Sequence, residues 1–211
     1  MERRFISAAR SGLRLQTRTD IEGRTISGYG AVFYKANDPG TEYRLWDDMV
    51  ERIMPSAFDR AIREDDVRSL FNHDPNIMLG RKSAGTLDLS IDATGLRYEV
   101  TPADTQLVRD QVLSPIERGE VSGSSFMFVP RESTIREETR DGETTYIREL
   151  LDVELWELGP VVFPAYESTT TGVRAAGQHD EVRAELAAWL AARDARRAEA
   201  IHIRARAVEV G

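Results

Sequence analysis

Alternating hydrophobic and polar positions dominate the chain up to about residue 165 and predict β-strands. Residues 87–92 alternate cleanly, and residues 96–100 follow after a short turn as the second strand of a hairpin. Residues 24–33 also alternate, but two glycines among them predict a bent or bulged strand. Asp141-Gly142 is a further hairpin signal before another alternating run. This part of the chain is therefore expected to be mostly β.

Two segments with helical periodicity interrupt the strands. Residues 55–62 form a short one with an apolar face. Residues 105–118 form the second, where Asp104 is placed to cap the helix and Pro115 to kink it. The inward face of this second helix is expected to consist of Leu107, Val108, Val112 and Leu113. Strands interleaved with helices at irregular spacing predict an α+β barrel or sandwich rather than a regular βαβ sheet.

The pattern changes near residue 168. Residues 168–178 are rich in small residues and predict a linker. Beyond it the sequence is strongly helical to about residue 200, with an apolar stripe of Val182, Leu186, Trp189 and Leu190. Residues 201–206 fit either a short strand or a frayed helix. We therefore expect a domain over 1–167, a linker over 168–178 and a helical tail over 179–211 that binds a partner or is cut off.

Composition removes several classes of function. The 211 residues include no cysteine, which excludes disulfides, thiolate metal sites and cysteine nucleophiles. The net charge of -8 argues against broad nucleic-acid binding. No apolar run approaches the roughly 20 residues of a membrane helix. The sequence also lacks a Walker loop, a dinucleotide-binding glycine motif and a His-Glu-x-x-His motif. We accordingly expect no cofactor, no metal, no nucleic acid and no membrane.

His73 is the first residue that could carry chemistry. It is one of three histidines, and it ends the apolar run Leu70-Phe71 at a turn. A strand end holds a catalytic histidine on the scaffold while letting it reach a cleft. Taken alone, the residue is explained more simply as a structural histidine beside a turn.

A second candidate is the segment 122–125, in which three serines surround a glycine before an apolar run. A nucleophilic serine needs a tight backbone and nearby amide N–H groups, and small residues permit both. The segment is not the Gly-x-Ser-x-Gly elbow of α/β-hydrolases. A polar loop leading into a strand is the simpler alternative for this segment alone.

The third candidate is the acidic strand 152–158. The strand period of two places Asp152 and Glu154 on one face, with Val153 and Leu155 on the other. A carboxylate here could orient a histidine imidazole, as the third member of a catalytic triad does. An ordinary solvated strand face remains the alternative.

Taken together and in this order, the three segments resemble the prohead maturation proteases of tailed bacteriophages, which are related to the herpesvirus assemblin serine proteases. The similarity covers about residues 10 to 170. It is carried by Gly28-Tyr29-Gly30-Ala31-Val32-Phe33, Asn72-His73-Asp74-Pro75 with Leu79-Gly80-Arg81, the run from Gly119 to Phe128, the strand from Asp152 to Val161, and Val162-Phe163-Pro164-Ala165-Tyr166.

The resemblance assigns roles to single residues. Ser125, directly before Phe-x-Phe, matches the nucleophile, with Ser124 as its nearest rival. His73 matches the general base. Asp152 matches the third member, and Glu157 is the rival for that role. The chain departs from the family pattern at Met127, where phage members usually have glycine, and at residues 160–161, where the herpesvirus branch has arginines.

The resemblance also implies a fold and a function. The fold would be a closed, mostly antiparallel β-barrel with surrounding helices, followed by the helical tail. The function would be serine endopeptidase activity on the scaffold segment of the major capsid protein and on the protease itself. The enzyme would act as a homo-oligomer inside the immature procapsid in the bacterial cytoplasm. The alternatives are a non-catalytic scaffolding protein on the same fold and an unrelated β-barrel binding module.

Overall fold

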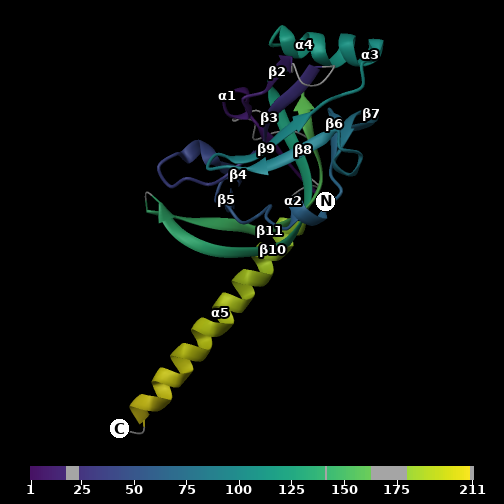
Figure 1. Ribbon diagram of the computed structural model, residues 1–211. Helices are drawn as coiled ribbons and strands as arrows, with labels where there is room; N and C mark the ends of the chain where they lie inside the picture. Colours follow the sequence, from purple (N-terminus) through teal and green to yellow (C-terminus); the bar gives the residue numbers. More distant parts are fainter. Residues whose placement is uncertain (18–23, 141, 163–179, 210–211) are drawn as a thin grey trace. The chain divides into compact units, whose positions relative to one another are not determined.

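We describe a computed structural model of the chain over residues 1–17, 24–140, 142–162 and 180–209 (Figure 1). Its internal contacts divide the chain into two units, 1–170 and 171–211. The predicted linker 168–178 lies outside the described residues. No helix in the described part is long and apolar enough to cross a membrane.

The strands of the first unit form two sheets. The seven-stranded sheet has the order β1-β10-β11-β5-β4, with β6 paired to β11 and β7 paired to β6. The four-stranded sheet has the order β2-β3-β9-β8. The strand bounds are β1 Glu2–Ile6, β2 Arg14–Thr17, β3 Arg24–Val32, β4 Glu42–Trp46, β5 Met49–Ile53, β6 Arg68–Phe71, β7 Asp74–Arg81, β8 Leu87–Ile91, β9 Gly95–Val100, β10 Gly123–Arg140 and β11 Glu143–Val161.

Most strand pairs are antiparallel, and β11 makes parallel pairs with β5 and β6. The mixed, mostly β class expected from the sequence is confirmed. The closed barrel expected from the resemblance is not confirmed, because the backbone hydrogen bonds of the described strands form two separate sheets. The hairpin predicted over 87–100 is present as β8 and β9, and β3 carries the predicted irregularity between Tyr29 and Ala31.

The helices of the first unit are short and differ in detail from the prediction. They are α1 Ala8–Ser11, α2 Ala61–Glu64, α3 Gln106–Val108 and α4 Ser114–Glu117, with a π-helical turn over Arg109–Leu113 and 3-10 turns over Pro39–Thr41 and Lys82–Ala84. Thr105 rather than Asp104 caps α3, because its hydroxyl accepts the Val108 N–H. Leu107 is exposed, whereas the other three residues of the predicted inward face are buried.

The second unit contains α5, Asp180–Glu209, a single helix that continues through the segment 201–206. The frayed-helix alternative for that segment is therefore the closer one. Val182 and Leu186 of the predicted apolar stripe are buried, and Trp189 and Leu190 are partly buried.

The long hairpin of β10 and β11 bends in its middle (Figure 1). Three irregularities in its register lie between Met127 and Ser133, and such bulges increase local bending and twist. The hydrophobic core takes side chains from both sheets, such as Phe126 and Leu158 from the hairpin and Ile26 and Val100 from the smaller sheet.

Four buried charges join β1 to the far end of the hairpin. We call Glu2, Arg4, Glu51 and Arg148 the ion cluster; each side chain is at most 5 % exposed. The Arg4 guanidinium donates to both Glu51 oxygens at 2.5 and 2.8 Å, and Arg148 Nη1 donates to Glu51 at 2.8 Å and to Glu2 at 2.9 Å. Side chains thus connect β1 to β5 and β11, although β1 forms no backbone pair with either strand.

Mutual attraction keeps the ion cluster charged. Burial alone would lower the pKa of Arg4 and raise the pKa of Glu51. The charges and hydrogen bonds of the partners reverse both effects, so the pKa of Arg4 is raised and the pKa of Glu51 is lowered. A lowered carboxyl pKa stabilises the fold above the unfolded pKa, and this stabilisation is lost as the pH falls through the folded pKa.

We predict that Glu51→Gln lowers the free energy of unfolding at pH 7 by about 3–5 kcal/mol, because two buried guanidinium groups would then share the single carboxylate of Glu2. Urea denaturation would measure the loss. The difference in free energy of unfolding between the variant and the unchanged protein should become smaller as the pH falls below about 4, where Glu51 of the unfolded chain is protonated. Asp88→Asn, at an exposed position of β8, is the matched control and should change stability little. Equal losses in both variants would contradict the prediction.

Candidate active site

The candidate active site is built around a tight turn that carries His73. Phe71 of β6 pairs with Asp74 of β7, so Asn72 and His73 form a two-residue hairpin loop. Both have positive φ, 55° and 61°, which is the requirement of a type I′ turn. Asparagine adopts this region readily, whereas a histidine there is uncommon. Such backbone strain at a polar residue is typical of functional sites.

Two contacts fix this turn against the end of β11. The Asn72 N–H donates to the Pro160 carbonyl at 3.1 Å, and the Val162 N–H donates to Asn72 Oδ1 at 2.8 Å. Beside them the β6 backbone approaches Gly159 so closely that a Cβ there would lie 2.0 Å from the Leu70 oxygen. Only glycine permits this approach without displacement.

Glu157 orients the His73 imidazole. Nδ1 of His73 is hydrogen-bonded to Oε1 of Glu157, and the two side chains are 8 % and 6 % exposed. Because a carboxylate oxygen only accepts hydrogen bonds, this contact places the proton of the neutral imidazole tautomer on Nδ1 and leaves Nε2 as the base nitrogen. Nε2 is buried and has no hydrogen-bond partner among the described residues. A buried nitrogen held ready in this tautomer is suited to take a proton from a nucleophile.

Ser125 points to the face of the sheet that carries this pair. Directly opposite residues of paired strands point the same way, and Ser125 is opposite both Gly159 of β11 and Phe5 of β1. Glu157 lies two residues before Gly159 and so shares that face. The Phe5 ring packs edge-on against the His73 ring, with centroids 5.9 Å apart. Ser125 itself is fully buried, and its hydroxyl donates to the Arg4 carbonyl at 2.9 Å.

Ser124 points to the opposite face. Its hydroxyl is 3.0 Å from the Tyr98 hydroxyl, and it is opposite the core residue Ile6. Burial raises the pKa of Tyr98, more than the hydrogen bond with Ser124 lowers it. The phenol is therefore protonated near neutral pH and cannot serve Ser124 as a base. Of the two candidate nucleophiles, only Ser125 shares a face with the histidine.

Asp152 lies elsewhere on β11 and interacts with arginines. Arg60 Nε is 3.2 Å from its Oδ1, and Arg131 Nε is 3.4 Å from its Oδ2. As predicted, Val153 and Leu155 are buried on the other face. The carboxylate that contacts His73 is thus Glu157, the rival residue, whereas Asp152 is bound to two guanidinium groups.

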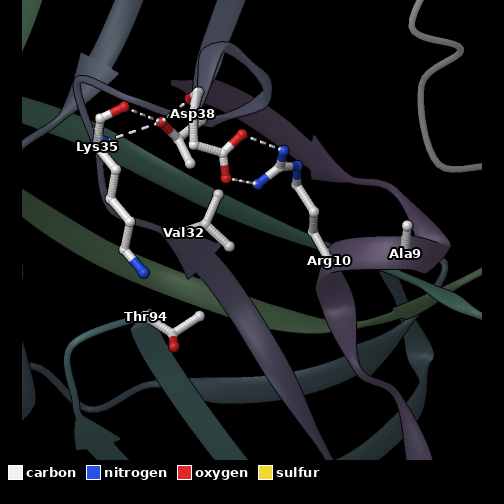
Figure 2. A pocket seen from close by; sticks show the side chains of 7 residues that line it. Ala9, Arg10, Val32, Lys35, Asp38 and Thr94 are labelled. Carbon is white, nitrogen blue, oxygen red and sulfur yellow. Dashed lines mark hydrogen bonds and ion pairs between the residues drawn. The ribbon is translucent and has the colours of Figure 1, made fainter.

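A separate hollow of about 250 Å³ lies beside β3. Figure 2 shows Arg10 and Asp38 facing each other in it, joined by two hydrogen bonds of 2.8 and 2.6 Å. Lys35 lines the same hollow. None of its lining residues is a histidine or a serine, so it does not offer the chemistry found around His73.

A comparison with known protein families identifies the family of the chain. The family described as caudovirus prohead serine protease matches residues 13–183. The chain belongs to this family. No curated protein and no solved structure matches the chain.

Membership of the prohead serine protease family makes the chain a serine protease of bacteriophage capsid maturation. The matched region contains His73, Ser125, Asp152 and Glu157, together with the strands that hold them. It begins after β1 and α1, so β1, which contacts Ser125, lies outside the match.

Sequence reasoning missed three residues that position the site. Asn72 holds the turn against β11, and Gly159 leaves room for the β6 backbone beside it. The backbone carbonyl of Arg4 accepts a hydrogen bond from the Ser125 hydroxyl. An asparagine between two strand-like runs is a recognisable turn signal for Asn72. No local signal marks Gly159 or Arg4, because both act through strands distant in the sequence.

We predict that Gly159→Ala lowers the free energy of unfolding by at least the ~1–3 kcal/mol typical of overpacking, because its Cβ would collide with the Leu70 backbone. Thermal or urea denaturation would measure it. Gly30→Ala is the control, since its Cβ would meet the Leu158 side chain at an ordinary 3.4 Å. A Gly159→Ala protein as stable as the Gly30→Ala protein would refute the close approach.

Proposed function

We propose that the protein is a serine endopeptidase with Ser125 as nucleophile, His73 as general base and Glu157 as the residue that orients the base. The observation that carries the proposal is the His73–Glu157 hydrogen bond, which leaves a buried, unpartnered Nε2 on the face of Ser125. Family membership supports the serine protease class. Asp152, our expectation from the sequence, becomes the second choice because Arg60 and Arg131 hold it.

The proposed reaction follows the usual course of acyl transfer. His73 Nε2 takes the Ser125 proton as the hydroxyl oxygen attacks a peptide carbonyl, and the resulting imidazolium is stabilised by Glu157. The same imidazolium then protonates the leaving amine, which breaks the peptide bond. Water, activated in turn by His73, hydrolyses the acyl-enzyme and restores the serine.

We further propose the finer biological role that the family suggests. The substrates would be the scaffold segment of the major capsid protein and the protease itself, with self-cleavage between about residues 165 and 180. The enzyme would work as a homo-oligomer inside the immature procapsid in the host cytoplasm. A closed barrel, in which the two sheets pack on one hydrophobic core, would be the corresponding fold.

One observation favours the alternative of a non-catalytic scaffolding protein. Ser125 is fully buried, and its hydroxyl is hydrogen-bonded to a backbone carbonyl rather than to His73. On this alternative the serine is a structural residue between β1 and β10. A change at Ser125 distinguishes the two functions.

We predict that Ser125→Ala abolishes cleavage of coexpressed capsid protein and of the chain itself, with a loss of about 10⁴-fold or more. Intact-mass measurement of the purified proteins would detect the products. Ser124→Ala is the matched control and should retain activity, because its hydroxyl faces Tyr98. Cleavage by the Ser125 variant at the original rate would exclude this nucleophile.

We also predict that Glu157→Gln lowers kcat strongly, by about the 10⁴-fold seen when a triad carboxylate is neutralised, while Asp152→Asn has a smaller effect. The reason is that only Glu157 fixes the His73 tautomer. The deshielded Nδ1 proton resonance of His73 should disappear in the first variant and persist in the second. A severe loss of kcat in Asp152→Asn with an unchanged rate in Glu157→Gln would reverse the assignment.

A further inference from the structure

β1 covers the proposed nucleophile. It pairs with β10 from Glu2 opposite Phe128 to Ile6 opposite Ser124. The Ser125 hydroxyl contacts the Arg4 carbonyl, and Phe5 packs on His73. A backbone carbonyl is the group that a serine protease attacks. An extended segment of the chain itself therefore presents a peptide carbonyl to Ser125 and leaves the serine with no exposed surface.

The side chains of β1 that face the interior complement the charges that receive them. Glu2 and Arg4 are two residues apart and share a face. Arg4 meets the Glu51 carboxylate, and Glu2 meets the Arg148 guanidinium. The receiving side thus offers one buried acid and one buried base, which are directly opposite each other on β5 and β11.

We propose that the edge of β10 beside Ser125, which β1 occupies, is the docking site for an extended substrate polypeptide. Glu51 and Arg148 would select segments with an acidic residue two positions before an arginine. This inference rests on the proposed function and deepens it by naming the substrate class. Strand addition to a sheet edge supplies main-chain hydrogen bonds, and pockets for alternate side chains supply specificity.

Competition follows from this arrangement. One edge of β10 pairs with only one strand at a time, so β1 must leave before a substrate strand docks. A strand attached to its own site competes at an effective concentration in the millimolar range. The full chain is therefore expected to bind short peptides weakly, and a chain whose β1 cannot leave is expected not to bind them.

A reversible disulfide tests the proposal. The chain has no cysteine, and Arg3 is directly opposite Met127, so the double variant Arg3→Cys/Met127→Cys offers one cross-strand pair. The probe is a fluorescent peptide that copies residues 1–7, and fluorescence anisotropy measures its binding. We expect binding to be at least about tenfold weaker in the oxidised protein than in the reduced protein. A fluorophosphonate should likewise label Ser125 only in the reduced protein.

Two controls isolate the role of β1 and of its charges. The single variants Arg3→Cys and Met127→Cys should respond to neither oxidant nor reductant. A peptide carrying R4E should bind the reduced double variant at least about tenfold more weakly than the original peptide, because a carboxylate would then face Glu51 in place of the Arg4 guanidinium.

The outcomes separate the two proposals. Equal peptide binding in the oxidised and reduced proteins would overturn the docking site, and so would failure of the two thiols to oxidise, since β1 would then not lie beside β10. Redox-dependent peptide binding without fluorophosphonate labelling in either state would support the docking site and contradict Ser125 as nucleophile.

Discussion

The close approach of the β6 backbone to Gly159 is the constraint on which the candidate site depends. Because residue 159 lacks a side chain, the β6–β7 hairpin lies directly against the end of β11. The Asn72 hydrogen bonds then fix the hairpin loop, and the loop holds His73 over Glu157. The contacts that hold the loop against β11 therefore set the position of the imidazole.

The alternation of side chains between the two faces of a strand then decides which neighbouring groups lie on the same face as the imidazole. Ser124 and Ser125 are adjacent in sequence but point to opposite faces, one toward Tyr98 and the other toward the histidine. A shift of one residue in the pairing of β10 would exchange the two. The register of β10 against β1 and β11 therefore matters as much for the proposed chemistry as the presence of a serine.

The sequence predicted the elements that have local periodicity better than it predicted the contacts between those elements. Alternation was sufficient for the β8–β9 hairpin, and the apolar stripe was sufficient for α5. The identity of the carboxylate beside His73 depends instead on the parallel pairing of β6 with β11, in which Glu157 is opposite Arg68. Strand period alone could not choose among the carboxylates of residues 152–157, and the closed barrel, inferred from resemblance alone, likewise depends on long-range pairing.

The ion cluster explains how β1 can be held firmly in place and still be able to leave as a unit. Removing one buried charge leaves the opposite charges without a partner, and this lowers the free energy of unfolding strongly. Departure of β1 removes Glu2 and Arg4 together, one charge of each sign, and leaves Glu51 with Arg148 at 2.8 Å. The receiving side remains a neutral ion pair and can accept another acid–base pair at the same spacing. The energetic penalty for an empty site is therefore mainly the exposed apolar surface around Ile6 and the unpaired edge of β10, both of which a docked strand would cover.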